Sequence, residues 1–394
     1  MNHREVVILA GARTPQGRFN GQFTGLSAVE LGAVAMRAAV ERAGVPVESV
    51  DAVLMGQVLQ AGAGQNPAKQ TANAAGLQWS VPAMTLNKVC LSGLAAVVDA
   101  SRMIRLGEAE VVVAGGQESM TGAPHLLPGS RQGLRYGSAT LLDHAAHDGL
   151  TDAFDHVSMG SSSETVNVRL GLTRAEQDEV AATSHQRATA AQRSGVFADE
   201  IVPVRVPQRR GDDLVITDDE GIRPDTTADS LARLRPAFAS EGTITAGNSS
   251  PLSDGAAAVV LASLSYATEH GLPWLARVDA SGHVAGPDNS LHSQPAGAIL
   301  AAAKRQGVEV VEFDFFEINE AFAAVAIQSM RDLGVDAAIV NINGGAIALG
   351  HPIGASGARL VLHAALELAR RGSGMAGVAL CGGGGQGDAL ILSR

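Results

Sequence analysis

SGLAAVVDASRMIRLGEAEVVVAGG (92–116) and SGARLVLHAALELARRGSGMAGVALCGG (356–383) are two versions of one pattern in a chain of 394 residues. Each opens with Ser-Gly, continues as an apolar helical stretch that ends in arginine and glycine, and leads into a short apolar strand. Another pair precedes them in each half, AAVERAGVPVESVDAVL (38–54) and AAAKRQGVEVVEFDFFE (301–317). Two matches in the same order predict a duplicated α/β domain.

The stretch between the copies fits neither of them. It is rich in turn-forming residues and contains one clear predicted helix, 173–195, with Thr173 as N-cap and Glu176 completing a capping box. An ordered apolar pattern returns over 241–263, as if the first copy were being completed. We therefore expect three parts: an N-terminal half from 1–120 plus 246–272, an inserted loop domain at 121–245, and a C-terminal half at 273–394.

Charge excludes some classes of function. The chain has 40 acidic against 29 basic residues, a formal net charge of −11, which disfavours binding to nucleic acid. No lysine follows a glycine, so a Walker-type phosphate loop is absent. The arginines of the inserted stretch either form a solvated face or supply local positive charge for an anionic ligand.

The sequence also predicts the surroundings of the protein. No apolar run approaches the roughly 20 residues that span a membrane, and the apolar stretch 6–12 is interpreted as a first strand. Two cysteines, Cys90 and Cys381, make no disulfide framework, so we expect a reducing, cytoplasmic interior. His144 and His147 have no third ligand nearby, so no metal site is expected.

One cysteine and one histidine lie in equivalent loops of the two copies. NKVCLSG (87–93) places Cys90 before a helix N-terminus, where we expect the thiol pKa to be lowered. GGAIALGHPIGASGA (344–358) places His351 in the matching loop. If the halves pack about a pseudo-twofold axis, His351 can approach Cys90 and take its proton. The alternatives are a small buried hydrophobe for Cys90 and a histidine that only satisfies loop carbonyls.

Two further motifs follow predicted strands. CGGGGQG (381–387) has the spacing of a dinucleotide fingerprint, but an apolar strand follows it instead of a helix. We interpret it as a tight turn between strands, with Cys381 at its mouth and backbone N–H groups free to hold an oxyanion. INEAF (318–322) places Asn319 and Glu320 at a strand end, where polar groups often face a site. Capping of the next helix is the alternative for Asn319.

Together these motifs resemble the thiolase family, and are closest to its acetyl-CoA acetyltransferase branch. The resemblance extends along essentially the whole chain, and its motifs include GQVLQAGAGQNPAKQ, NKVCLSG, AGGQESM, LRPAF, TAGNSSPLSDGAA, NEAFA, GGAIALGHPIGASG and CGGGGQG. It implies two βαβαβαββ halves that form a layered αβαβα core, with a loop domain inserted in the first half.

The resemblance also implies the chemistry of the site. Cys90 would be the nucleophile that takes the acyl group from acyl-CoA as a thioester. His351 would accept its proton and later hold the enolate oxygen together with a water bound by Asn319. Cys381 would remove the α-proton of the second acetyl-CoA, and the N–H groups of Cys90 and Gly383 would form a second oxyanion hole. Coenzyme A is substrate and product, and no metal or redox cofactor is implied.

Acyl-CoA substrates are implied in the same way. Arg223 would lie near the nucleotide end and Ser250 near the pantetheine, and further substrate contacts would come from Leu150, Met159 and Phe322. Acetoacetyl-CoA-specific members commonly have His-Met-Gly where this chain has Ser-Met-Gly (158–160), and 286–298 lacks the usual Met-Gly-x-Gly-Pro. Acyl-chain length is therefore the open property.

The expected reaction is the reversible condensation of two acetyl-CoA to acetoacetyl-CoA. Its closest alternative is a degradative 3-oxoacyl-CoA thiolase for longer chains. A decarboxylating ketosynthase is disfavoured because such enzymes generally place His or Asn at the position of Cys381. A catalytically silent CoA-binding or assembly protein is also disfavoured, because it has no need of four intact catalytic residues. The resemblance further implies a dimer or a tetramer, of which we expect the homotetramer, a dimer of dimers, with 121–140 as the tetramerisation loop.

Overall fold

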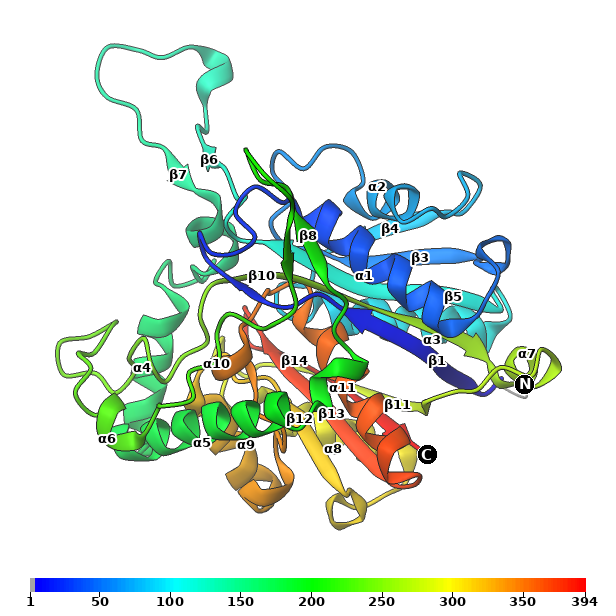
Figure 1. Cartoon of the computed structure of the whole chain (residues 1–394). Coiled ribbons are helices and arrows are strands. Elements are labelled where there is room, and N and C mark those ends of the chain that lie inside the picture. The colour runs from blue at the N-terminus through cyan, green and yellow to red at the C-terminus, as the bar shows by residue number, and fades with distance from the viewer. Residues whose placement is uncertain (1–3) are drawn as a thin grey trace.

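A computed structural model describes residues 4–394, and its first half contains every element of a βαβαβαββ unit (Figure 1). The first helix, α1, begins after a Ser27 capping box and ends at Gly44, whose φ of 66° is left-handed, as the predicted glycine C-cap requires. In chain order the elements are β1 (Val6–Arg13), α1 (Ala28–Ala43), β3 (Ala52–Gly56), α2 (Pro67–Ala74), β4 (Ala83–Leu86), α3 (Ser92–Leu106), β5 (Val111–Ser119) and β10 (Ser253–Ser263).

The second half repeats this order with one strand reduced. Where β4 would have its counterpart, only an isolated parallel bridge joins Phe316 to Val340. The predicted duplication is therefore confirmed, with a shorter edge in the second copy. Its elements are β11 (Ala276–Ala285), α8 (Gln294–Gln306), β12 (Phe315–Ile318), α9 (Ala323–Leu333), α11 (Ser356–Arg371), β13 (Met375–Gly382) and β14 (Gln386–Ser393).

The strands of both halves join in one sheet path, β12-β13-β14-β11-β1-β10-β5-β3-β4. Parallel pairing is confined to the outer strands of each half, and the halves meet where β1 pairs antiparallel with β11, Val6 opposite Val278. Apolar clusters then separate the layers. One cluster lies between α1, α2 and the first half's strands, a second between α8 and the second half's strands, and a third surrounds α3 and α11. This is the expected αβαβα order.

Glycines allow the two central helices to pack closely. A Cβ on Gly93 of α3 would lie 2.9 Å from the backbone nitrogen of Ala358, and one on Gly357 of α11 would lie 2.3 Å from that of Leu94. Real Cβ atoms need more room, so only glycine fits at both positions. The reciprocal contact lies at the Ser-Gly that opens both sequence repeats, and it puts the two helix N-termini together.

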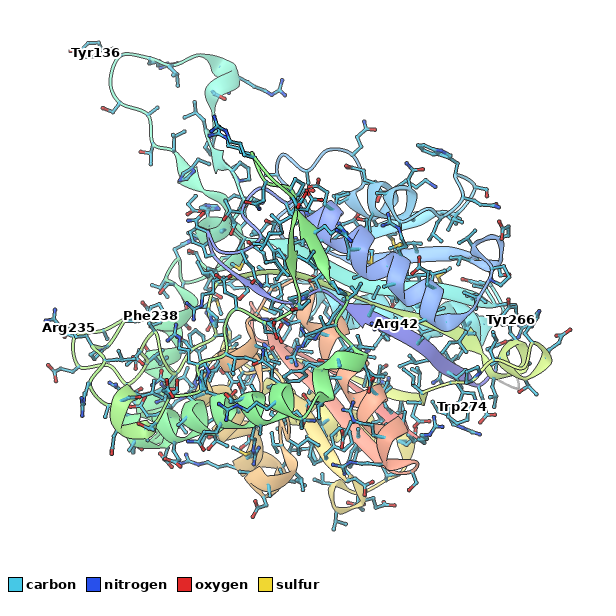
Figure 2. The ribbon with its side chains drawn as sticks, viewed as in Figure 1. Arg42, Tyr136, Arg235, Phe238, Tyr266 and Trp274 are labelled. Atoms are coloured by element: carbon cyan, nitrogen blue, oxygen red, sulfur yellow. The ribbon has the colours of Figure 1, made fainter. Side chains whose placement is uncertain are left out.

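The excursion between β5 and β10 contains the predicted helix and one that the sequence pattern missed. The predicted helix is α5 (Arg174–Arg193), which begins with the expected Thr173–Glu176 capping box. The missed helix is α4 (Met159–Leu170), whose Gly- and Ser-rich first turn has low helix propensity. An arm with β6 (His125–Leu126) and β7 (Leu142–Asp143) projects from the body (Figure 1), and its Tyr136 is fully exposed (Figure 2). The other elements are β8 (Val204–Val206), β9 (Leu214–Ile216) and α6 (Ala228–Leu231).

Candidate active site

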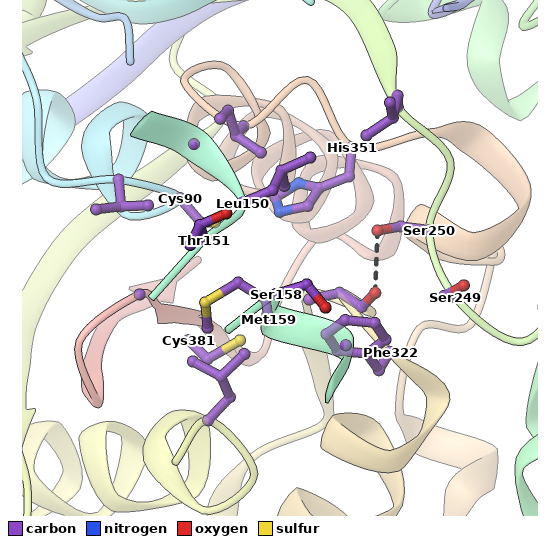
Figure 3. Close-up of a pocket in the computed structure, with 18 of the residues that line it drawn as sticks. Cys90, Leu150, Thr151, Ser158, Met159, Ser249, Ser250, Phe322, His351 and Cys381 are labelled. Atoms are coloured by element: carbon purple, nitrogen blue, oxygen red, sulfur yellow. Dashed lines mark hydrogen bonds between the residues drawn. The ribbon is translucent and has the colours of Figure 1, made fainter. Parts of the chain in front are cut away.

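A cavity of about 300 Å³ opens beside the N-termini of the central helices. Both halves and the excursion line it, and Figure 3 shows its side chains around one hollow. Of the ten residues that the sequence analysis assigns to the site, all but Asn319 and Arg223 line this cavity: Cys90, Leu150, Met159, Ser250, Phe322, His351, Cys381 and Gly383.

Cys90 follows a strained residue. Val89 has a φ of 50°, a left-handed conformation that is rare for a β-branched side chain. The turn presents the thiol to backbone N–H groups of Cys90 itself and of Gly383. Burial nevertheless raises the pKa of the Cys90 thiol to about 12. The N–H group of Cys90 lowers this pKa, the charge of Glu118 raises it, and the N–H group of Gly383 lowers it by less than Glu118 raises it. The expected lowering of this pKa is therefore wrong, because desolvation outweighs the backbone N–H groups that face the thiol.

His351 is held as a neutral base. Its Nδ1 lies 2.6 Å from the Ser356 hydroxyl, which donates to the Pro352 carbonyl, so Nδ1–H donates to Ser356. Its Nε2 lies 3.3 Å from the Asn319 amide nitrogen and accepts from it. Burial lowers the pKa of His351 to about 3, and the charge of Arg359 lowers it further. The imidazole therefore offers an Nε2 lone pair at neutral pH.

Asn319 lies behind the histidine rather than on the cavity wall. It is fully buried at the end of β12, and its Oδ1 has no hydrogen-bond partner among the described residues. The capping alternative is wrong, since the N-cap of α9 is Phe322. Glu320 does not face the cavity either, because it binds the Ser184 hydroxyl at 2.7 Å and the Asn341 amide at 3.0 Å.

Cys381 lies at the end of β13, where the predicted glycine turn forms. β13 and β14 pair antiparallel, with Cys381 opposite Gly387, and Gly384 and Gly385 adopt φ values of 78° and 65°. Burial raises the pKa of the Cys381 thiol, and the neighbouring Cys90 raises it further. The same hairpin brings Gly383 to Cys90, so both cysteines face one reaction space.

The remaining wall of the cavity is mainly apolar. Met159 and Phe322 pack around its inner end with Leu291. Ser158 caps α4 by accepting the Ser161 N–H at 3.1 Å, and the Ser250 hydroxyl donates to the Ala321 carbonyl at 3.0 Å (Figure 3). This wall suits an uncharged acyl chain and an amide-bearing tether better than an ion.

The sequence matches known proteins in two consecutive blocks. Residues 6–265 match the family described as "Thiolase, N-terminal domain" and residues 272–394 match "Thiolase, C-terminal domain". The chain belongs to the thiolase family. A relative in Mycolicibacterium smegmatis named "Probable acetyl-CoA acetyltransferase" is 60% identical over 98% of this chain and all of its own length. Proteins named "Acetyl-CoA acetyltransferase" in Pseudomonas aeruginosa and Cupriavidus necator are 51% and 49% identical, each over 99% of this chain and 100% and 99% of their own.

Arg223 lies outside the lining of the thiolase cavity. Its side chain is exposed, and its backbone N–H donates to His185 Nδ1 at 3.2 Å. Partial burial and the charge of Arg18 lower the pKa of Arg223, so the two guanidinium groups lie near one another. The residue after Arg18, Phe19, donates its N–H to the carbonyl of Leu252, which lines the cavity. The backbone next to Arg18 therefore reaches the cavity lining, whereas neither guanidinium group lines the cavity.

The sequence analysis missed a buried carboxylate that ties the site together. Glu118 is fully buried at the end of β5 and accepts backbone N–H groups from Val58, Leu59 and Gly354 at 3.0, 3.1 and 2.9 Å. Gly354 lies in the histidine loop of the second half, so one carboxylate joins loops from both halves. Its place in the AGGQESM motif at a strand end was the available signal.

Within residues 4–394, no group of three His, Cys, Asp or Glu side chains is arranged to hold a metal ion. Among the helices described, none is both long and apolar enough to span a membrane.

Proposed function

We propose that this thiolase is an acetyl-CoA C-acetyltransferase. It would join two acetyl-CoA molecules reversibly to acetoacetyl-CoA and CoA through an acetyl group on Cys90. The observation that carries the proposal is the meeting of Cys90, His351 and Cys381 in one cavity with a mainly apolar wall. The printed names of the full-length relatives support the same reaction.

In the first half-reaction, Cys90 attacks the thioester carbonyl of acetyl-CoA. The thiol is protonated in the resting site, so it needs a base, and the neutral Nε2 of His351 accepts the proton as the C–S bond forms. The CoA sulfur leaves with that proton from His351, which restores the neutral imidazole. Ser356 keeps Nδ1 protonated throughout and so fixes the tautomer.

In the second half-reaction, Cys381 acts on the second acetyl-CoA in its thiolate form. Because burial raises the pKa of the thiol, this form is a minor one that has released its proton to solvent, and the steps that follow regenerate it. The thiolate takes the α-proton, the resulting carbanion attacks the acetyl carbonyl on Cys90, and the proton returns to the Cys90 sulfur as it leaves. The burial that raises the pKa of Cys381 makes its thiolate a strong base. A water bound by Asn319 would hold the enolate oxygen, while the N–H groups of Cys90 and Gly383 hold the oxyanion on the acetyl carbon. The implied contact of His351 to the enolate oxygen is not available in this tautomer, because Nε2 carries no proton once the CoA thiol has left. These steps would need no cofactor, because coenzyme A enters and leaves as substrate and product.

Thiolysis rates with CoA across 3-oxoacyl-CoA substrates test the assignment. Activity confined to the four-carbon substrate is the expected result. Efficient cleavage of medium or long chains would instead support the degradative alternative, with Ser158 as the first residue to examine. Absence of cleavage with every substrate would refute the thiolase mechanism.

We further propose that the protein is a cytoplasmic homotetramer. The segment 121–140 supports the assembly, because Leu134 and Tyr136 within it, and Leu141 directly after it, expose large apolar side chains far from the core. Two free cysteines that must stay reduced support a reducing compartment. Light scattering on the intact chain and on Tyr136→Ser with Leu134→Ser tests the assembly: the intact chain should have four times the monomer mass, and the variant should be smaller.

A further inference from the structure

An ion pair joins the loop that carries Cys90 to the hairpin that carries Cys381. The Nζ of Lys88 lies 2.7 Å from both carboxylate oxygens of Asp388. Lys88 belongs to the first half of the chain, two residues before Cys90, whereas Asp388 lies on β14 of the second half. In the β13–β14 register Asp388 is opposite Leu380, the residue next to Cys381. The pair therefore spans the two halves beside both cysteines.

The carboxylate of this pair is buried. The Asp388 side chain is 1% exposed and that of Lys88 is 33% exposed. The other partner of Asp388 is His283 on β11, whose Nδ1 lies 2.7 Å away and whose Nε2 lies 2.9 Å from the Arg102 guanidinium on α3. A buried carboxylate is costly unless it is paired and hydrogen-bonded. The contact therefore holds the Lys88 loop in a fixed position against β14, which an exposed ion pair would not do.

The Cys90 turn needs such a restraint. The left-handed conformation of Val89 is strained for a β-branched residue and persists only where surrounding contacts enforce it. On the other side of Val89, the Ser92 hydroxyl accepts the Lys88 N–H at 2.8 Å and donates to the Val89 carbonyl at 2.6 Å. The Lys88 side chain then ties the same turn to β14.

We propose that Lys88 and Asp388 are positioning residues that set the place of Cys90 relative to Gly383 and Cys381. Neither touches the reacting atoms. This inference rests on the proposed function, because its consequence concerns the two half-reactions. Acetylation of Cys90 depends on its own loop and on His351, whereas condensation also needs the hairpin in register with that loop. Loss of the ion pair therefore slows condensation more than acetylation.

Two single variants, their double variant and a rescue test this. Lys88→Gln should lower kcat of condensation about tenfold to a hundredfold, since displacements near 1 Å have effects of that size, with KM little changed. The rate of acetyl-Cys90 formation, followed by intact mass, should fall less than about threefold. Asp388→Asn should behave similarly, the double variant should add little, and Lys88→Arg should recover most of kcat. Arg370→Gln, which breaks an ion pair with Glu367 at the far end of α11, is the matched control and should change neither rate.

Two results would overturn the proposal. One is full condensation kcat in both single variants; the other is an equal loss of acetylation and condensation, which a merely structural role would give. If the unaltered protein fails to condense acetyl-CoA, the proposed function fails, but the inference is still tested by alkylation of Cys381 with iodoacetamide in a Cys90→Ala background. Lys88→Gln should then change the alkylation rate at least about threefold, and an unchanged rate would refute the positioning role.

Discussion

Cys90 in the resting protein should react with iodoacetamide as a protonated thiol, in spite of its helix N-terminus. At pH 8 a thiol of pKa about 12 is ionised in about one molecule in ten thousand, whereas an ordinary cysteine is about one-quarter ionised. The thiolate of the less acidic thiol is the better nucleophile, and its higher reactivity offsets the smaller thiolate fraction by about fortyfold. The net expectation is alkylation about sixtyfold slower than that of an unperturbed cysteine. The imidazole of His351 does not change this, because a base of pKa about 3 leaves the thiol protonated.

The chain suits this assay because it holds only two cysteines. In the Cys381→Ala variant every adduct reports on Cys90, and intact mass follows its formation from pH 6 to 9.5. The logarithm of the rate should rise by about one unit per pH unit without a plateau. The same variant unfolded in urea is the control and should level off above about pH 8.5. A plateau below pH 8 in the folded protein, or a folded rate equal to the unfolded one, would refute the argument that burial dominates this thiol.

Other variants test the division of labour and the packing. Cys381→Ala should still be acetylated at Cys90 by acetyl-CoA, as intact mass would show. Its condensation rate should fall by about a hundredfold or more, since the variant lacks the α-proton base. A missing acetyl adduct would contradict the separation of roles. His351→Ala should slow acetylation itself by about 10²–10⁴ in single-turnover mass measurements. Arg223→Gln should raise KM for CoA with little change in kcat, and an unchanged KM would remove it from the CoA site. Gly357→Ala should lower the free energy of unfolding, measured in urea, by about 2–3 kcal/mol, because its Cβ would lie 2.3 Å from a backbone nitrogen. Gly297→Ala is the control and should be neutral or stabilising, since its Cβ would lie 3.5 Å from the nearest side-chain atom.

The proposed site lies at the junction between the two halves. His351 and Cys90 come from equivalent loops, Glu118 joins the loops of both halves, and Lys88 with Asp388 joins the Cys90 loop to the Cys381 hairpin. A duplicated fold thus provides one site where its two halves meet, and each copy contributes different groups to it. A substitution that disturbs the packing of α3 against α11 should therefore lower the catalytic rate before it disturbs the outer helices.

The sequence by itself determined the repeat, the glycine helix caps and the turn after Cys381, and the resemblance that it carries supplied the candidate residues of the reaction, which stay a prediction. Those features are local: a left-handed cap needs glycine wherever it occurs, and a capping box is read within four residues. Neighbouring residues along the chain suffice to predict them, as Gly44, Gly307 and Thr173 illustrate.

The tertiary structure alone decided which groups meet and how their environment alters them. Asn319 and Glu320 are neighbours in sequence, yet the first binds His351 and the second turns to Ser184. The pKa of Cys90 reverses the sequence expectation because desolvation depends on every layer packed around the thiol, which no local pattern encodes. The Lys88–Asp388 pair joins positions 300 residues apart, so only the folded chain could show that contact.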